Sequence, residues 1–179
     1  MPKKSDLVGE SASRLRLMAF DVDGVLTNGD LYFTPNGDEI KVFSSLDGHG
    51  LKMLKEGGIE VAIITGRKSE MVAKRAANLG ITHLFQGVED KRAVMRDLRT
   101  QLDLRADQSG YMGDDVVDLP ILRACGFSAT VADGHDFVKE HVDYVTRKGG
   151  GAGAVREVCD FILAAQGKLD AMHNAYLNV

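Results

Sequence analysis

The chain has 179 residues, of which 44% are hydrophobic and 27% are charged, with a formal net charge of −4. This length fits one domain with a single core, and the acidic balance argues against nucleic acid as a partner. No apolar stretch approaches the roughly 20 residues that cross a bilayer, and the polar start lacks the apolar centre of a signal peptide, so we expect a cytoplasmic protein with no membrane partner.

The chain alternates short apolar runs with amphipathic stretches from Leu15 onward. This alternation is typical of a parallel sheet covered by helices, and continuous runs such as VAII at 61–64 suggest strands buried on both faces. We therefore predict an α/β fold, a three-layer Rossmann-like parallel sheet with helices on both faces. The predicted strands are 15–20, 60–65, 82–86, 109–113, 127–132 and 143–146, and the predicted helices are 48–57, 68–80, 90–102, 115–125, 135–142 and 154–169.

One segment departs from this alternation. Residues 31–43 read LYFTPNGDEIKVF, two β-prone runs separated by Pro35 to Asp38. Asn-Gly readily takes the positive φ angles of a tight turn, so we predict a β-hairpin insertion at about 30–44. The domain is then 15–167, with an N-terminal extension at 1–14 and a C-terminal tail at 168–179 that we expect to be mobile at its end.

Two cysteines, Cys125 and Cys159, are too few and too far apart in sequence for a disulfide framework. Neither has His or Cys neighbours at zinc-ligand spacing. We interpret both as reduced core residues.

An acidic pair stands where the first predicted strand ends. Asp21 and Asp23 flank a single valine, and Gly24 allows a sharp turn. Strand side chains alternate faces, so the two carboxylates could address one small volume. Such a pair repels unless a cation lies between the two groups or one of them keeps its proton. For an arbitrary Asp-X-Asp, helix capping is the competing explanation.

Three more polar groups follow later predicted strands, at the sheet edge where open α/β folds bind ligands. Each has a structural alternative, because a Thr could cap a helix, a Lys could be solvated, and aspartates could complement a helix dipole. It is far less probable that all of these groups fall at one edge of the sheet by chance. The groups are Thr65-Gly66-Arg67, then Lys91, then Asp114-Asp115 with Asp118.

With these motifs the sequence resembles the haloacid-dehalogenase superfamily of phosphotransferases, whose four motifs match DVDGV, ITGR, Lys91 and GDDVVD. The resemblance implies that Asp21 attacks phosphorus to form an aspartyl-phosphate. It also implies that Asp23 binds the substrate, protonates the leaving oxygen and later activates water. The implied cofactor is Mg²⁺, held by the Asp21 carboxylate, the backbone carbonyl of Asp23 and Asp114.

The same resemblance assigns the remaining motif residues to supporting roles. Thr65, Gly66 and Lys91 would bind the phosphoryl oxygens and offset the charge of an acid-crowded site. Asp115 and Asp118 would orient a metal-bound water or Lys91.

The chain has no room for the cap domain that most members of that superfamily insert. A narrower resemblance, from about Leu15 to Leu169, is to the tetrameric, capless 3-deoxy-D-manno-octulosonate 8-phosphate phosphatases, through DVDGVLTNGDLYF, VAIITGR, GDDVVDLP and AAQGKLD. It implies a homotetramer in which a neighbouring subunit covers the site, and a tail that can close over it. The implied substrate is a sugar acid phosphate on the route to the lipopolysaccharide inner core.

A carboxylate on the substrate calls for a cation beyond Lys91. Arg67 and Arg75 are the candidates; Arg75 could act in its own or an adjacent subunit, or be a solvated helix arginine. Relatives acting on nine-carbon sugar acid phosphates tend to carry Glu at the position of Arg67, so Arg67 favours the eight-carbon substrate. Roles for Arg156, Asp47 and His49 stay open.

Other functions remain as alternatives. Within the enzyme class they are a phosphatase of nine-carbon, sialic-acid-like 9-phosphates and a phosphatase of general sugar phosphates. Outside it stands a non-catalytic sugar-phosphate-binding protein. A signalling receiver domain also uses acids, a Thr and a Lys on a parallel sheet, but it places its metal-binding acids side by side after the first strand, which the order here does not match.

Overall fold

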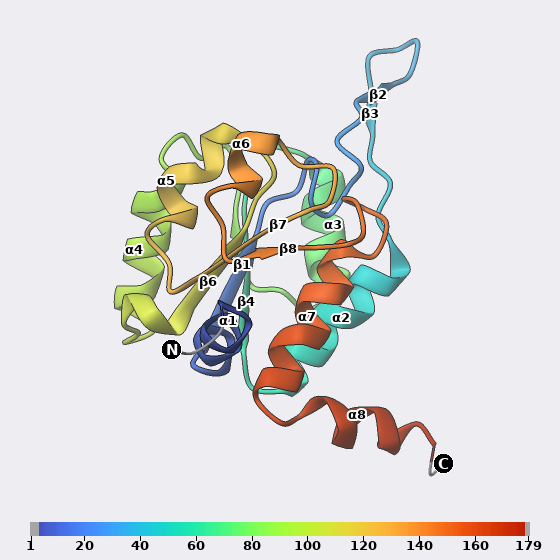
Figure 1. Cartoon of the computed structure of the whole chain (residues 1–179). Helices are drawn as coiled ribbons and strands as arrows, with labels where there is room; N and C mark the ends of the chain where they lie inside the picture. Colours follow the sequence, from blue (N-terminus) through green and yellow to red (C-terminus); the bar gives the residue numbers. More distant parts are fainter. Residues whose placement is uncertain (1–3, 178–179) are drawn as a thin grey trace.

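A computed structural model describes residues 4–177 of the chain and shows a six-stranded parallel sheet with the order β5-β4-β1-β6-β7-β8 (Figure 1). The order places β1 at the centre, between β4 and β6. Phe20, the last residue of β1, is aligned with Ile63 and Met112. The strands are β1 Leu17–Phe20, β4 Glu60–Ile64, β5 His83–Phe85, β6 Ser109–Met112, β7 Phe127–Thr130 and β8 Tyr144–Val145.

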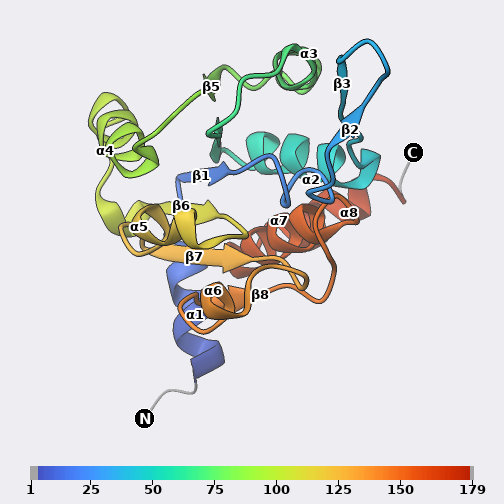
Figure 2. The same ribbon diagram turned by 90° about the horizontal axis from the view of Figure 1, so that it is seen from above.

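Helices cover both faces of this sheet, as predicted (Figure 2). The two apolar cores follow from the alternation of strand side chains, because Met18 and Phe20 pack into one and Leu17 and Ala19 into the other, all fully buried. One face carries α1 Lys4–Ser13, α2 Ser45–Glu56, α3 Glu70–Asn78 and α7 Ala154–Ala165, and the other carries α4 Lys91–Gln101, α5 Leu119–Leu122 and α6 Asp136–Lys139.

The predicted hairpin is present and projects from the body of the molecule (Figure 1). Its strands are short: β2 Tyr32–Phe33 pairs antiparallel with β3 Glu39–Ile40. Gly37 takes a φ of 87° in the turn, a conformation that glycine adopts without strain. Between β1 and β4 the described chain holds only this hairpin and α2, and between β4 and α4 only α3 and β5, so the expectation of a capless domain is confirmed.

Both chain ends hold helices that the sequence did not predict. The N-terminal extension contains α1, whose Ala12 is buried beside α7. The last predicted helix, 154–169, is broken, because Gly167 has a φ of 68° and a new helix, α8 Leu169–Ala175, begins after it. The mobility of the tail stays a prediction, and its last two residues lie outside the described part.

The predicted helix at 115–125 is also divided. A 3₁₀ turn at Val116–Asp118 precedes the short α5, which has Pro120 in its first turn. Within residues 4–177, no helix has the length and apolar character needed to cross a membrane.

Candidate active site

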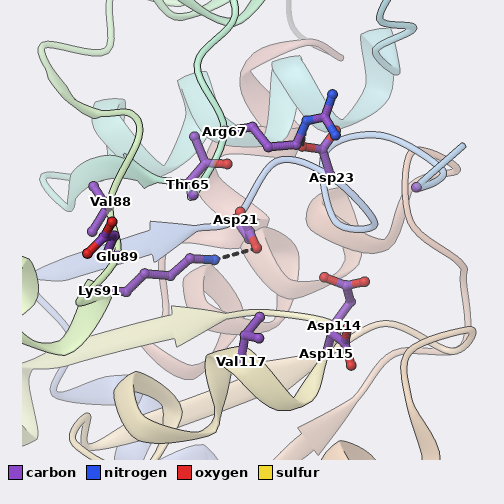
Figure 3. A pocket seen from close by; sticks show the side chains of 12 residues that line it. Asp21, Asp23, Thr65, Arg67, Val88, Glu89, Lys91, Asp114, Asp115 and Val117 are labelled. Carbon is purple, nitrogen blue, oxygen red and sulfur yellow. Dashed lines mark hydrogen bonds and ion pairs between the residues drawn. The ribbon is translucent and has the colours of Figure 1, made fainter. Parts of the chain in front are cut away.

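A cavity of about 420 Å³ opens at the carboxyl ends of the central strands (Figure 3). This is the edge where the chain order reverses across β1, which is where open α/β sheets bind ligands. Eight of the ten predicted site residues line this cavity; they are Asp21, Asp23, Thr65, Gly66, Arg67, Lys91, Asp114 and Asp115.

Asp21 is the buried acid of this cavity. Its Oδ2 accepts a hydrogen bond from Lys91 Nζ at 2.6 Å, and its Oδ1 accepts one from the N–H of Val22 at 2.7 Å. Burial, and next the charge of Asp118, raise the pKa of Asp21 to about 6, although Lys91 opposes the shift. The carboxylate is thus oriented by two donors with an oxygen toward the open cavity.

Asp21 and Asp23 share the cavity for a different reason from the one predicted. β1 ends at Phe20, so strand alternation does not reach the pair. A tight turn follows instead, in which the N–H groups of residues 25–27 all donate to the carbonyl of Val22 at 2.9 to 3.2 Å. The turn places both aspartates on the cavity wall in different surroundings.

Lys91 is the first residue of α4 and is not a solvated lysine. Its side chain is only 9% exposed, and its ammonium donates to Asp21 Oδ2 and, at 2.7 Å, to Asp118 Oδ1. Burial lowers the pKa of Lys91, but these two carboxylates outweigh burial and raise it above its ordinary value. Lys91 therefore stays charged beside the cavity.

Asp118 is fully buried and supports this arrangement. Its Oδ1 binds Lys91, while its Oδ2 accepts from the N–H groups of Asp114 and Asp115 at 3.1 and 3.4 Å. Both oxygens are engaged with donors, which agrees with the expected role of orienting Lys91.

Three carboxylates could hold a divalent cation. Oxygens of Asp21, Asp114 and Asp118 lie within 4.8 Å of one another. Burial, followed by the charges of Asp118 and Asp21, raises the pKa of Asp114 to about 7. One lysine does not balance this charge, and carboxylate oxygens are the ligands that Mg²⁺ prefers. The donor set therefore fits the predicted cofactor.

Gly24 explains how the backbone of the first motif approaches Asp114. A side-chain carbon at position 24 would collide with the Asp114 carboxylate, and the φ of 83° favours glycine independently. Asp114 thus lies against the peptide that follows Asp23, as expected if the Asp23 carbonyl completes the ligand set.

The other predicted residues lie at the cavity rim or away from it. Thr65 is buried at the end of β4, with exposed Gly66 after it. Asp115 is exposed and caps the following 3₁₀ turn through the N–H of Val116. Arg75 does not reach the cavity: its guanidinium donates to the carbonyl of Ser44 at 3.1 Å.

Sequence reasoning missed three residues at the site. Tyr111 is buried in β6, and its hydroxyl accepts from Lys91 at 3.2 Å and donates to the carbonyl of Ile64 at 3.0 Å. Lys41, in the hairpin, forms an ion pair with Asp23, and Glu39 forms one with Arg67 at 2.6 Å. The alternation in EIKVF places Glu39 and Lys41 on one face of the hairpin strand, but it does not indicate the partners that they contact.

Known proteins are similar to this chain over nearly its whole length. Residues 85–157 match the haloacid dehalogenase-like hydrolase family. The 3-deoxy-D-manno-octulosonate 8-phosphate phosphatase of Escherichia coli K12 is 47% identical over 169 residues, which cover 94% of this chain and 89% of that protein.

Two solved structures share the fold closely. The 3-deoxy-D-manno-octulosonate 8-phosphate phosphatase of Moraxella catarrhalis, in complex with magnesium, phosphate and KDO, has a TM-score of 0.92 at 43% identity, covering 94% of this chain and 97% of that one. The phosphatase of the same name from Yersinia pestis has a TM-score of 0.90 at 45% identity, covering 92% and 89%. The chain thus belongs to the haloacid dehalogenase-like hydrolases, in the family of the 3-deoxy-D-manno-octulosonate 8-phosphate phosphatases.

Proposed function

We propose that the chain is a Mg²⁺-dependent phosphoric monoester hydrolase that converts 3-deoxy-D-manno-octulosonate 8-phosphate to 3-deoxy-D-manno-octulosonate and phosphate, in the synthesis of lipopolysaccharide inner-core precursors. The observation that carries the proposal is the buried contact of Asp21 with Lys91 at the cavity, beside Asp114. The relatives named for this reaction supply the substrate.

Asp21 is the nucleophile in this proposal. Its carboxylate oxygen forms a bond to phosphorus while the bond from phosphorus to the sugar oxygen breaks, and that oxygen leaves with the electron pair and takes a proton from Asp23. Lys91 remains charged throughout and, with Thr65 and Gly66, binds the phosphoryl oxygens.

The aspartyl-phosphate is then hydrolysed. A water oxygen bonds to phosphorus, its proton passes to Asp23, and the bond from phosphorus to Asp21 breaks to release phosphate. Mg²⁺, held by the carboxylates of Asp21 and Asp114 and the carbonyl of Asp23, supplies positive charge that keeps Asp21 ionised and neutralises the phosphoryl group.

Arg67 is the proposed partner of the sugar carboxylate. It lies at the mouth of the cavity with 45% of its side chain exposed, so it can reach a bound ligand. Its guanidinium pairs with Glu39, and substrate has to compete with that pair. The guanidinium fork suits a carboxylate.

A panel of sugar phosphates, compared by kcat/KM with Mg²⁺, tests the proposed function. The eight-carbon acid phosphate is expected to be the best substrate, ahead of a nine-carbon sugar acid 9-phosphate and of sugar phosphates without a carboxylate. Preference for the nine-carbon compound would reassign the substrate. Binding without turnover of any member would favour a non-catalytic protein.

Arg67→Glu tests the carboxylate assignment. It is expected to lower kcat/KM for the eight-carbon substrate by about 10- to 100-fold more than for an alkyl phosphate without a carboxylate, because it replaces attraction with repulsion. Arg96→Glu, an exposed arginine on α4, is the matched control and leaves both values unchanged. Equal losses on the two substrates would contradict a specificity role for Arg67.

We also propose that the chain forms a homotetramer through the hairpin. Leu31, Phe33, Ile40 and Val42 are 47% to 60% exposed on this projecting element, an apolar surface that a partner subunit would bury. A neighbouring subunit would then cover the open cavity, and a role of Arg75 in binding substrate would be across that contact.

A cytoplasmic location completes the proposal. Cys125 and Cys159 are both free thiols, and burial is the main cause that raises the pKa of each. Unpaired, unreactive cysteines agree with a reducing compartment.

A further inference from the structure

Lys41 is a buried cation that no motif of the sequence explains. It follows β3 in the hairpin, 18 residues from Asp23 in sequence, yet its ammonium binds Asp23 Oδ1. Only 4% of the Lys41 side chain is exposed, against 22% for that of Asp23. A lysine on a projecting hairpin could keep its ammonium in water, so burying it against one carboxylate requires a compensating interaction.

The surrounding charges form a closed ring. Lys41 also pairs with Glu39 Oε1 at 3.4 Å, and the same oxygen pairs with Arg67 at 2.6 Å. Arg67 Nε returns to Asp23 Oδ2 at 3.7 Å. Each oxygen of the Asp23 carboxylate therefore faces one cation, and Glu39 joins the two cations, which fixes the carboxylate in two directions.

Alternation along the hairpin strand produces this ring. Glu39 and Lys41 are two residues apart and point toward the cavity side, while Ile40 and Val42 point the other way and are exposed. The element that carries the apolar outer surface thus also delivers charges to the site.

We propose that Lys41 is a positioning residue, which holds the Asp23 side chain where, once protonated, it gives its proton to the leaving oxygen. The proposal rests on the function proposed above, because it needs Asp23 to be the proton carrier. Arg67 has 45% of its side chain exposed and is the proposed partner of the sugar carboxylate, so Lys41 is the contact to Asp23 that is expected to persist when substrate binds. Glu39 in turn holds Lys41 in place.

The leaving group provides a specific test. An alkoxide, such as the oxygen of a sugar or simple alkyl phosphate, needs a proton as its bond to phosphorus breaks. The anion of 4-nitrophenol is stable without one. Because kcat/KM reports the steps up to the loss of the leaving group, it excludes the later activation of water. A displaced Asp23 therefore slows alkyl substrates selectively.

The experiment compares Lys41→Met with wild type on an alkyl phosphate without a carboxylate and on 4-nitrophenyl phosphate, both with Mg²⁺. We expect kcat/KM to fall by about 10- to 100-fold for the alkyl phosphate and by less than about threefold for the aryl phosphate. Lys41→Arg, which keeps the cation, recovers most of the loss. Lys52→Met, on the exposed side of α2, is the matched control and changes neither value.

A double-variant cycle shows whether Lys41 acts through Asp23. If it does, adding Lys41→Met to Asp23→Asn lowers alkyl-phosphate turnover no further. Equal losses on both substrates, or a further loss in the double variant, would overturn the proposal. Retained aryl turnover shows that Lys41→Met is folded. Wild-type protein that releases phosphate neither from these two compounds nor from the eight-carbon sugar acid phosphate would instead contradict the proposed function.

Discussion

An excess of carboxylates over cations sets the protonation of the individual acids in the site. Asp21, Asp114 and Asp118 surround a single buried ammonium, that of Lys91. The pKa values of Asp21 and Asp114, raised mainly by burial to about 6 and about 7, mean that the site without metal retains protons near neutral pH. Mg²⁺ must displace those protons, so its binding is expected to strengthen as pH rises.

The same shifts predict an unusual pH dependence of stability for the metal-free protein. Both acids have folded pKa values above 3.8, so between about pH 4 and 7 the native state holds protons that the unfolded state has lost. Their contribution to stability is complete below pH 3.8 and is lost as pH rises through 6 to 7. Thermal midpoints in EDTA should show this loss, and excess Mg²⁺ should remove it.

Asp114→Asn and Asp115→Asn separate this effect from general charge effects. The first removes a group with a raised pKa and should flatten the decline of the thermal midpoint in EDTA. The second removes an exposed charge that contributes less to that pKa than burial, Asp118 and Asp21 do, so it should largely preserve the decline. An unchanged slope in Asp114→Asn would contradict the assignment.

Some residues of the site could be predicted from the sequence and others could not. Asp21, Lys91 and Asp114 were predictable because each follows a strand, and parallel strands bring such positions to one edge. Lys41 and Tyr111 were not, because their roles depend on contacts with Asp23 and Lys91 across 18 and 20 residues of chain. A lysine in a hairpin and a tyrosine in an apolar strand look ordinary in sequence.

Among the elements, α2 and α7 are joined by a buried carboxylate. Asp47, in the first turn of α2, is 1% exposed and accepts from the N–H groups of Gly153 and Arg156, at 3.3 and 2.8 Å, where α7 begins. Burial raises the pKa of Asp47 above its ordinary value, partly offset by these hydrogen bonds. Asp47 thus caps a helix more than 100 residues later in the chain.

Substitution of Asp47 is expected to destabilise the fold. Asp47→Ala leaves two N–H groups without their acceptor and should lower the free energy of unfolding by about 1 to 2 kcal/mol in urea titrations. Asp47→Asn keeps one acceptor oxygen without a buried charge, so it should lose less. Asp170→Ala, an exposed acid in the first turn of α8, should change stability by less than about 0.5 kcal/mol. Equal effects at positions 47 and 170 would contradict the cap.

Strands and helices were predictable where the hydrophobic pattern of the sequence was strong. The buried runs and the amphipathic stretches gave six strands and their covering helices, because one-sided and two-sided burial leave different periods in sequence. The tail could not be predicted in this way, because α8 is largely exposed and has little periodicity. It packs against α7 and the core through Leu169 and Met172, and Tyr176, just after α8, lies 3.3 Å from His49 of α2. A distant contact of this kind has no local signature.

At the scale of the whole molecule, the hairpin determines the proposed assembly. Light scattering should give the mass of a tetramer for the wild type. Phe33→Asp, which places a charge on the apolar outer side of the hairpin, should shift the mass toward smaller species and lower turnover as the proposed lid is lost. Phe137→Asp, at another exposed phenylalanine, on α6, should leave the tetramer intact. A tetramer that survives Phe33→Asp would contradict assembly through the hairpin.

The central claim is that the phosphoryl group passes through Asp21, and trapping that intermediate tests it most directly. Wild-type protein turning over 3-deoxy-D-manno-octulosonate 8-phosphate with Mg²⁺ is quenched in acid, reduced with borohydride and analysed by peptide mass spectrometry. The account predicts reduction at position 21, which disappears in EDTA and in Asp21→Asn, a variant that releases no phosphate. Turnover without modification at position 21, or persistent phosphate release by Asp21→Asn, would contradict it.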